Sequence, residues 1–86
     1  MATYALRFAP SAERELARLD PPVRRRVWTR IQALGNDPRP AASEPLKGTD
    51  GRRLRVGDYR VLHRIEQDVL EILVVRVARR EVYRRL

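Results

Sequence analysis

Arginine side chains alternate with apolar ones between residues 46 and 64, and this spacing suits the binding of a phosphate group. Successive side chains of a β-strand point to opposite faces, so Arg53 and Arg55 share one face, and Arg60 and Arg64 share a face of the next strand. Gly57 and Asp58 separate the two runs and indicate a tight turn, although the preferred order is Asp then Gly, and such a turn would bring both sets onto one sheet face. Like charges opposite each other destabilise a sheet, so this density of one sign favours an anion site over a merely solvated face.

Two neutral side chains, His63 and Tyr83, are the candidates for moving a proton beside this charge. Arginine is a poor base because its pKa lies above ~12. The imidazole pKa of ~6.5 suits proton transfer, but strand alternation turns His63 away from Arg60, which favours a structural role. The arginines that flank Tyr83 should lower the pKa of its phenol. Such a set suits cleavage of RNA by its own 2′-hydroxyl, which needs cationic donors around the phosphate, a base and an acid.

Metal, cofactor and serine-nucleophile chemistry is not indicated. The chain has no Cys, one His and no carboxylates at a recognisable ligand spacing. Gly48 and Gly51 are not followed by the Lys-Ser/Thr pair and helix of a phosphate-binding loop. Nothing marks Ser11 or Ser43 as activated. We therefore expect no metal and no cofactor.

The composition indicates one small, basic domain that spans residues 1–86. The 86 residues include 19 basic and 11 acidic side chains, for a net charge of +8, and Lys47 is the only lysine. A polyanion or an acidic protein is the partner that this charge favours, and a partner would also stabilise so small a core. No apolar run approaches the ~20 residues that span a bilayer, and the N-terminus lacks a signal peptide, so we expect a cytoplasmic protein with no membrane partner.

The N-terminal half is expected to form a strand and a helical hairpin. Residues 3–8 alternate as a half-buried strand, and Ser11 is a reasonable N-cap for a helix through Leu19. Asp20 and Pro21 are the expected N-cap and first residue of a second helix. The second helix has an apolar stripe at helical spacing: Val23, Val27, Ile31 and Leu34. Residues 37–45, with three prolines, are expected to form a loop without regular hydrogen bonding.

The C-terminal half is expected to complete an antiparallel sheet. After the arginine-rich pair of strands, residues 66–68 turn the chain into an apolar strand over 69–77, and residues 79–86 form a short helix or final turn. The prediction is an α+β fold with a mainly antiparallel four-stranded sheet and the helices on one face.

Two features of the second helix have both a structural and a functional interpretation. Trp28 lies beside the apolar stripe, and an edge or core role is about three times as plausible as base stacking or contact with a partner. The run Arg24 to Arg26 is usually a solvated face, but it also suits RNA phosphates or an acidic partner segment.

The chain resembles the RelE/ParE superfamily of toxins from toxin–antitoxin systems. The resemblance rests on Leu46, Lys47 and Gly48, on the core LRVGDYR at residues 54–60, on the stop at residues 36–38, and on the closing run RREVY at residues 79–83. The RelE-like branch is favoured. Members of this branch are ribosome-dependent mRNA endonucleases (mRNA interferases) that inhibit translation. The resemblance also implies a cognate antitoxin, the ribosome and mRNA as partners, and a toxin–antitoxin hetero-oligomer.

The resemblance implies a set of site residues. The catalytic ones are Arg55, Arg60, Arg80 and Tyr83. The resemblance also matches Arg53, and we expect Arg53 and the other basic residues of the stretch 46–64 and of the closing run to bind RNA: Lys47, Arg52, Arg64 and Arg79. The resemblance does not separate Arg79 from Arg80 as the arginine near the end of the last strand. The best-known member has lysines at the positions of Arg53 and Arg55, so the identity of the general base is open.

Two other functions remain as alternatives. A ParE-like toxin inhibits DNA gyrase without nuclease chemistry, and a basic module of this size could bind RNA or the ribosome without catalysis. The joint presence of Arg60 and Tyr83 favours the endonuclease.

Overall fold

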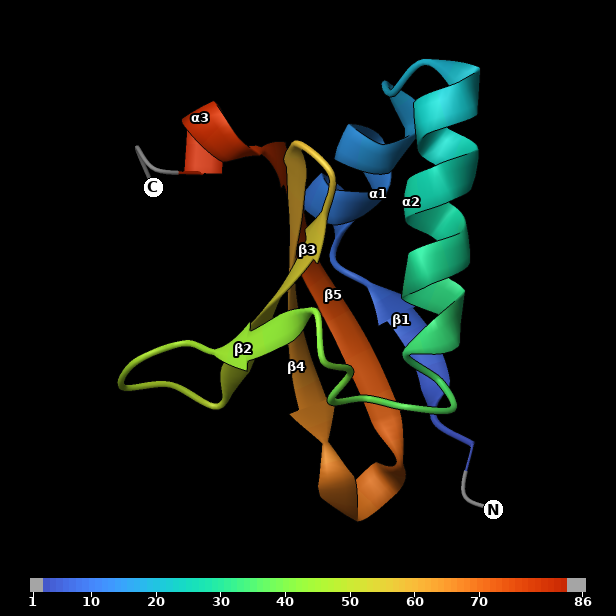
Figure 1. Ribbon diagram of the computed structural model, residues 1–86. Helices are drawn as coiled ribbons and strands as arrows, with labels where there is room; N and C mark the ends of the chain where they lie inside the picture. The colour runs from blue at the N-terminus through green and yellow to red at the C-terminus, as the bar shows by residue number, and fades with distance from the viewer. Residues whose placement is uncertain (1–2, 84–86) are drawn as a thin grey trace.

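A computed structural model of the protein describes residues 3–83 and shows a five-stranded sheet with two helices packed on one face (Figure 1). In chain order the elements are β1 (Ala5–Phe8), α1 (Pro10–Ala17), α2 (Pro21–Ala33), β2 (Ser43–Pro45), β3 (Gly51–Val56), β4 (Tyr59–Glu66), a 3₁₀ turn (Gln67–Val69), β5 (Glu71–Arg79) and α3 (Arg80–Tyr83). The strand order is β1-β5-β4-β3-β2, with β1 parallel to β5 and the other neighbours antiparallel. The α+β class and the single helical layer are confirmed, whereas the expected number of strands was too small.

The additional strand is β2, which lies in the segment expected to be a loop without regular hydrogen bonding. Ser43 lies opposite Leu54, and Glu44 lies opposite Arg53. An edge strand pairs along one side only, so a three-residue strand tolerates a proline that a central strand would exclude. The prediction for this segment was wrong because strand pairing depends on a partner that is distant in sequence.

The start of α2 follows the expectation, and the start of α1 does not. Asp20 is the N-cap of α2 and Pro21 its first residue, and the carbonyl of Asp20 accepts the Arg24 N–H at 2.8 Å. Helix α1 begins at Pro10 with Ala9 as N-cap, because proline fits the first helical position. Ser11 therefore lies inside the first turn, and its hydroxyl donates to the carbonyl of Val75 at 3.4 Å.

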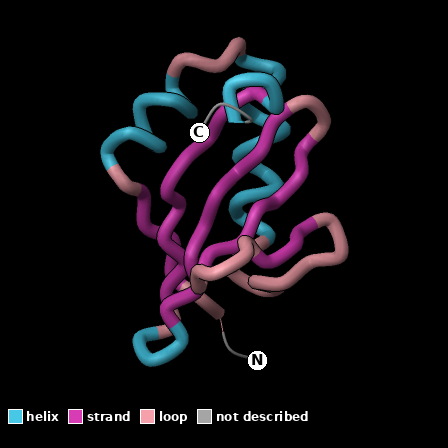
Figure 2. The backbone as a smooth tube through the Cα atoms, turned by 90° about the vertical axis from the view of Figure 1, so that its left-hand side faces the viewer, coloured by secondary structure: helices cyan, strands magenta, loops and turns pink. Residues whose placement is uncertain are grey.

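The core lies between the two long helices and the sheet. The predicted stripe of α2 faces inward, and Val27, Ile31 and Leu34 are fully buried. Their partners on the sheet are Leu54, Val56, Val61, Ile72, Val74 and Val77. We call this side of the sheet the helix face. The other side, turned to the viewer in Figure 2 with α3 over its upper end, carries Arg53, Arg55 and Arg60, and we call it the arginine face.

An irregularity in β5 interrupts its alternation. Ile72 and Val74 point to the helix face, but the register passes from Leu62–Arg76 to His63–Val74 and leaves Val75 as an extra residue. Val77, two positions beyond the extra residue, therefore re-enters the core. The strand also begins at Glu71 and not at Val69, because the 3₁₀ turn precedes it.

Helix α1 continues the edge of the sheet where β1 ends. The N–H of Ala9 donates to the Val74 carbonyl at 2.9 Å. Six residues later, the Glu15 carboxylate accepts the Val77 N–H at 2.9 Å and three hydrogen bonds from the Arg76 guanidinium at 2.9 to 3.2 Å. Side chains of a helix thus satisfy strand groups that a sixth strand would otherwise pair. No helix within residues 3–83 is long and apolar enough to cross a membrane.

Candidate functional site

A tight turn between β3 and β4 brings the arginines of both strands onto one face. Of the two central turn residues only Gly57 has a positive φ, at 57°, which matches the type II′ hairpin with glycine first. The turn places Arg55 directly opposite Arg60, and Arg53 opposite Leu62. The convergence of the arginines expected from the sequence is therefore present.

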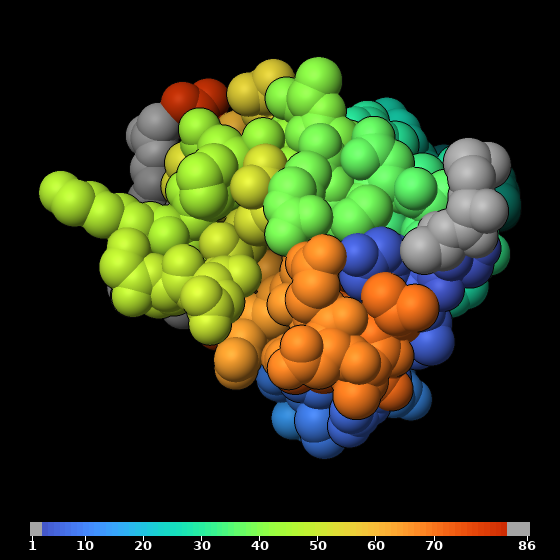
Figure 3. All heavy atoms as spheres, turned by 90° about the horizontal axis from the view of Figure 1, so that it is seen from below, coloured from blue at the N-terminus to red at the C-terminus, as the bar shows by residue number. Residues whose placement is uncertain are grey.

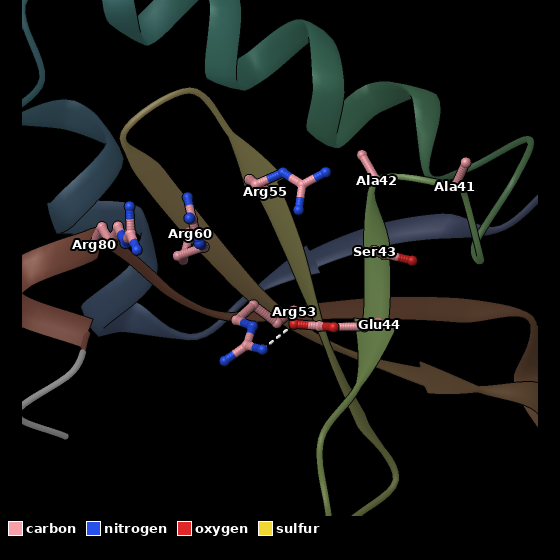
Figure 4. Close-up of a pocket in the computed structure, with 8 residues that line it drawn as sticks. All are labelled: Ala41, Ala42, Ser43, Glu44, Arg53, Arg55, Arg60 and Arg80. Atoms are coloured by element: carbon pink, nitrogen blue, oxygen red, sulfur yellow. Dashed lines mark hydrogen bonds and ion pairs between the residues drawn. The ribbon is translucent and has the colours of Figure 1, made fainter.

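These arginines line a pocket of about 230 Å³ that lies between β2 and the start of α3 (Figure 4). Its lining residues are Ala41, Ala42, Ser43, Glu44, Arg53, Arg55, Arg60 and Arg80. Four guanidinium groups face one carboxylate, so the pocket has an excess of positive charge. The small residues Ala41 and Ala42 at the β2 side leave room for a ligand. An anion with several oxygen atoms is the ligand that fits this lining.

The contacts of the arginines fix some of them and leave others available. The Arg60 guanidinium donates to the carbonyls of Gly57 at 3.0 Å and Tyr59 at 2.9 Å, which holds it beside the turn. Arg53 forms an ion pair with Glu44. The exposed guanidinium of Arg55 makes no hydrogen bond or ion pair with the side chains that the structure describes. A phosphate would thus meet one oriented donor at the turn and one donor that can adapt to it.

Glu44 is the charged residue of the described lining that the sequence pattern did not indicate. The hydrogen bond and charge of Arg53 lower the pKa of the Glu44 carboxyl below its ordinary 4.5, and the charges of Arg55 and Arg60 lower it further. The carboxylate is therefore ionised at neutral pH. The alternation of Ser43 and Glu44 could have revealed it, but only if the proline-rich segment had been recognised as a strand beside β3.

Helix α3 brings Arg80, and not Arg79, to the pocket. The backbone N–H of Arg80 donates to the Asp58 carbonyl at 2.7 Å, so the hairpin turn holds the first turn of α3. Arg79 is exposed in a neighbouring hollow with Asp58 and Glu81, which Arg80 also borders. The backbone of Tyr83 ends α3, while its side chain lies outside the described part of the chain.

Three of the expected RNA-binding residues lie away from the pocket. Lys47 is exposed in the segment 46–50, which projects from the molecule (yellow-green in Figure 3). Arg64 lies near the end of β4, and its Nη2 is 3.7 Å from Oε1 of Glu66. Arg52 points to the helix face and donates from Nε and Nη2 to the Ser43 hydroxyl, at 3.2 and 3.0 Å.

His63 is buried on the helix face and does not reach the pocket. Its side chain is 1% exposed, Nε2 lies 3.4 Å from the Pro38 carbonyl, and Nδ1 has no hydrogen-bond partner. Burial lowers the pKa of the imidazole below its ordinary 6.5, so the ring is neutral at pH 7. This position agrees with the structural role favoured by strand alternation.

The two ambiguous features of α2 also have structural contacts. Trp28 is 37% exposed and packs against Phe8 with ring centroids 5.9 Å apart, which makes it an edge residue. Arg24 donates to the carbonyls of Ala17 and Leu19 at 3.2 and 3.3 Å, and so satisfies the end of α1. Its two arginine neighbours, residues 25 and 26, are exposed.

The sequence matches a family model over residues 6–82, and that family is described as the ParE toxin of the type II toxin–antitoxin system parDE. The match spans the sheet, both long helices and most of α3. No curated protein sequence matches significantly.

Solved structures of toxin–antitoxin complexes share the fold. The RelBE2 complex from Mycobacterium tuberculosis matches with a TM-score of 0.80 and 28% identity, covering 90% of this chain and 98% of that chain. The RelE–RelB complex from Pyrococcus horikoshii matches with a TM-score of 0.81 and 26% identity, covering 91% and 96%. The RelBE complex from E. coli matches with a TM-score of 0.77 and 25% identity, covering 88% and 95%. Each similarity extends over nearly the full length of both chains.

Proposed function

The chain belongs to the family of ParE toxins of type II toxin–antitoxin systems, within the RelE/ParE superfamily, and on this premise we propose that it cleaves ribosome-bound mRNA. The observation that carries the proposal is the pocket of Arg53, Arg55, Arg60 and Arg80 around Glu44. Its charge suits a phosphodiester, and its carboxylate suits removal of a proton.

The reaction that we propose needs no group from outside the RNA and the protein. The 2′-oxygen attacks the adjacent phosphorus and forms a new P–O bond, while the bond from phosphorus to the 5′-oxygen of the next nucleotide breaks. The products are a 2′,3′-cyclic phosphate and a free 5′-hydroxyl. Arg55, Arg60 and Arg80 stabilise the negative charge that grows on the phosphate oxygens in the transition state.

Glu44 is the general base in this proposal. It is the one carboxylate in the described lining of the pocket, and it is ionised at neutral pH because its pKa lies below 4.5, so its oxygen atoms are free of a proton and can accept one. Arg53 orients it through their ion pair. Arg53 and Arg55, which cannot deprotonate a hydroxyl, then need no role in proton transfer. We assign the acid that protonates the leaving 5′-oxygen to Tyr83, three residues after Arg80 in α3.

The ribosome supplies what the pocket lacks. The described lining contains arginines, a glutamate and small side chains, and no aromatic ring on which a base could stack. We propose that the ribosome holds the mRNA in the in-line geometry that the reaction requires. We propose that this activity takes place in the cytoplasm.

A cognate antitoxin is the partner that we propose for the resting state. The similar structures named above are complexes of RelE-type toxins with RelB-type antitoxins. The net charge of +8 and the uncovered arginine face both favour an acidic segment of that antitoxin. Such binding would exclude RNA from the pocket within a hetero-oligomer.

Primer extension on mRNA in a translating extract tests the proposed cleavage. We expect discrete cuts that require ribosomes and that disappear when the antitoxin is added. The family name also supports a second candidate, inhibition of DNA gyrase, which a supercoiling assay reports. Gyrase inhibition together with intact mRNA would replace the first proposal by the second.

A further inference from the structure

Two residues on the helix face bind the segment that leads into β2, although the pocket lies on the other face. Arg52 and His63 are directly opposite each other across β3 and β4. Arg52 makes two hydrogen bonds to the Ser43 hydroxyl and a third, from Nη2, to the Ser43 carbonyl at 3.3 Å. His63 lies 3.4 Å from the Pro38 carbonyl through Nε2. We call Arg52 and His63 the back clamp.

The back clamp acts on Glu44 through the geometry of a strand. Ser43 and Glu44 are neighbours in β2, so their side chains point to opposite faces. Fixing Ser43 on the helix face therefore fixes Glu44 on the arginine face. The pairing of this segment with β3 is short, because β2 is a three-residue edge strand with Pro45 at its end. The back clamp adds to the contacts of the Ser43 hydroxyl with the Pro40 carbonyl, at 2.9 Å, and of Glu44 with Arg53.

We propose that Arg52 and His63 are positioning residues that hold Glu44 in the arginine pocket from the opposite side of the sheet, and that acid weakens this hold through His63. The catalytic part of this inference rests on the proposed cleavage of RNA. The positioning part depends only on the contacts of the back clamp with residues 38–43.

The surroundings of His63 explain the effect of acid. The neutral ring donates from Nε2 to the Pro38 carbonyl, and Nδ1 then needs no acceptor. A protonated ring would carry a second N–H at Nδ1, which makes no hydrogen bond in the structure, on a residue that is 1% exposed. Arg52, opposite on β3, repels the charged ring, while Val74 opposite on β5 offers only an apolar side chain. The carbonyls of Pro38 and Val61 favour the charged ring, but burial has the larger effect.

The sign of the pH dependence follows from the lowered pKa. As the pH falls below about 6.5, the unfolded chain binds a proton at His63 before the folded chain does. The folded arrangement therefore loses stability from about pH 6.5 downward, until the folded ring is also protonated. Glu44 becomes protonated only at lower pH, because its pKa is below 4.5. The effects of protonating His63 and of protonating Glu44 can therefore be separated by pH.

Matched variants test the clamp. Arg52→Met removes the three hydrogen bonds and keeps an apolar stem of similar length. His63→Gln keeps an N–H donor near the position of Nε2 but does not titrate in this range, whereas His63→Met keeps the volume without a donor. Arg14→Met, an exposed arginine on α1, is the control for loss of one charge.

The first readout is hydrogen exchange, which does not depend on nuclease activity. We expect Arg52→Met and His63→Met to speed exchange of the Ser43 and Arg55 amides, which donate to Pro40 and Ala42, by roughly five- to tenfold. Amides between β4 and β5 should keep their protection, and Arg14→Met should match the wild type throughout. Unchanged exchange at Ser43 and Arg55 in both clamp variants would overturn the proposal, whether or not the protein cleaves RNA.

The second readout is single-turnover cleavage on ribosomes from pH 5.5 to 8. We expect Arg52→Met to slow the cleavage step by about 10²-fold with unchanged ribosome affinity, the size that a displaced catalytic group produces. His63→Gln should cleave like the wild type at pH 7.5 and should lose the decline below pH 6.5. An identical decline in wild type and His63→Gln would refute the acid-sensitive part. Absence of cleavage by the wild type would refute the proposed function and leave the exchange result to decide the clamp.

Discussion

Arg55 and Arg60 face each other directly across β3 and β4, next to the hairpin turn that joins the strands. Two like charges in this arrangement repel, and the repulsion costs roughly 0.2–1 kcal/mol in a sheet. A bound phosphate would convert this repulsion into shared attraction for the same oxygen atoms. We therefore expect this pair to destabilise the fold when no anion is bound, and to stabilise the complex when an anion lies between the two guanidinium groups.

Replacement of Arg55 by Gln should stabilise the fold and weaken the function. The change removes the repulsion from Arg60 and leaves the buried neighbours Leu54 and Val56 in place. We expect the free energy of unfolding to rise by about 0.2–1 kcal/mol at low salt, and less at high salt, while cleavage falls. Urea unfolding at two salt concentrations measures the first effect. A loss of stability at low salt would contradict it.

Replacement of Arg60 by Ala should abolish cleavage and growth inhibition without unfolding the protein. The side chain donates to two backbone carbonyls at the turn and points to the arginine face, away from the buried core residues Leu54, Val56 and Val61, so we expect the packing of the sheet to remain. Loss of a charge-assisted contact to the transition state costs about 2.7–4 kcal/mol of barrier, or 10²–10³-fold in rate. Circular dichroism and primer extension measure fold and activity. A folded variant that cuts at the wild-type rate would remove Arg60 from the site.

Replacement of Glu44 by Gln should remove the general base while keeping the size of the side chain. We expect the single-turnover rate to fall by roughly 10²–10⁴-fold and ribosome binding to stay the same or strengthen, because one negative charge leaves a cationic pocket. Glu13→Gln, an exposed acid on α1, controls for the charge. In the wild type, the loss of cleavage rate that comes from protonation of Glu44 should occur below pH 4.5, because Arg53 lowers the pKa of this carboxyl. Near-normal cleavage by Glu44→Gln would assign the base elsewhere.

Replacement of Tyr83 by Phe separates proton transfer from stacking. If the phenol protonates the leaving oxygen, the single-turnover rate should fall by roughly 10²–10⁴-fold with ribosome affinity intact. Weaker ribosome binding with an unchanged cleavage step would instead make Tyr83 a stacking residue. The variant retains the aromatic ring, so the ring itself serves as the internal control.

The arginine hairpin and the helical layer could be predicted from the sequence because their patterns are local. Alternation along β3 and β4 assigns each arginine to a face, and the Val27, Ile31 and Leu34 stripe assigns the buried side of α2. Together, the two patterns place three of the four pocket arginines, Arg53, Arg55 and Arg60, on the face of the sheet that the helices do not cover.

The rest of the pocket could not be predicted because it depends on pairing between distant segments. Nothing in the local sequence of residues 43–45 indicates a strand, since β3 supplies its hydrogen bonds. Glu44 was missed for this reason, and Arg52 was assigned to RNA although Ser43 binds it on the other face. Arg79 and Arg80 are adjacent in sequence, and only the contact of Arg80 with the Asp58 carbonyl identifies the one that lines the pocket.

The carboxylate of Glu15 occupies the edge of β5 just where β1 stops, and this has a consequence for the concentration at which the protein can be handled. An unpaired strand edge is a template on which the strand of another molecule can dock, and such docking leads to aggregation. Glu15 covers the Val77 N–H and neutralises Arg76, so it removes one such template. We expect Glu15→Ala to fold at micromolar concentration but to form thioflavin-positive aggregates at lower protein concentration than the wild type. In that case the solubility of the protein depends on the Glu15 side chain of α1 as well as on the high net charge.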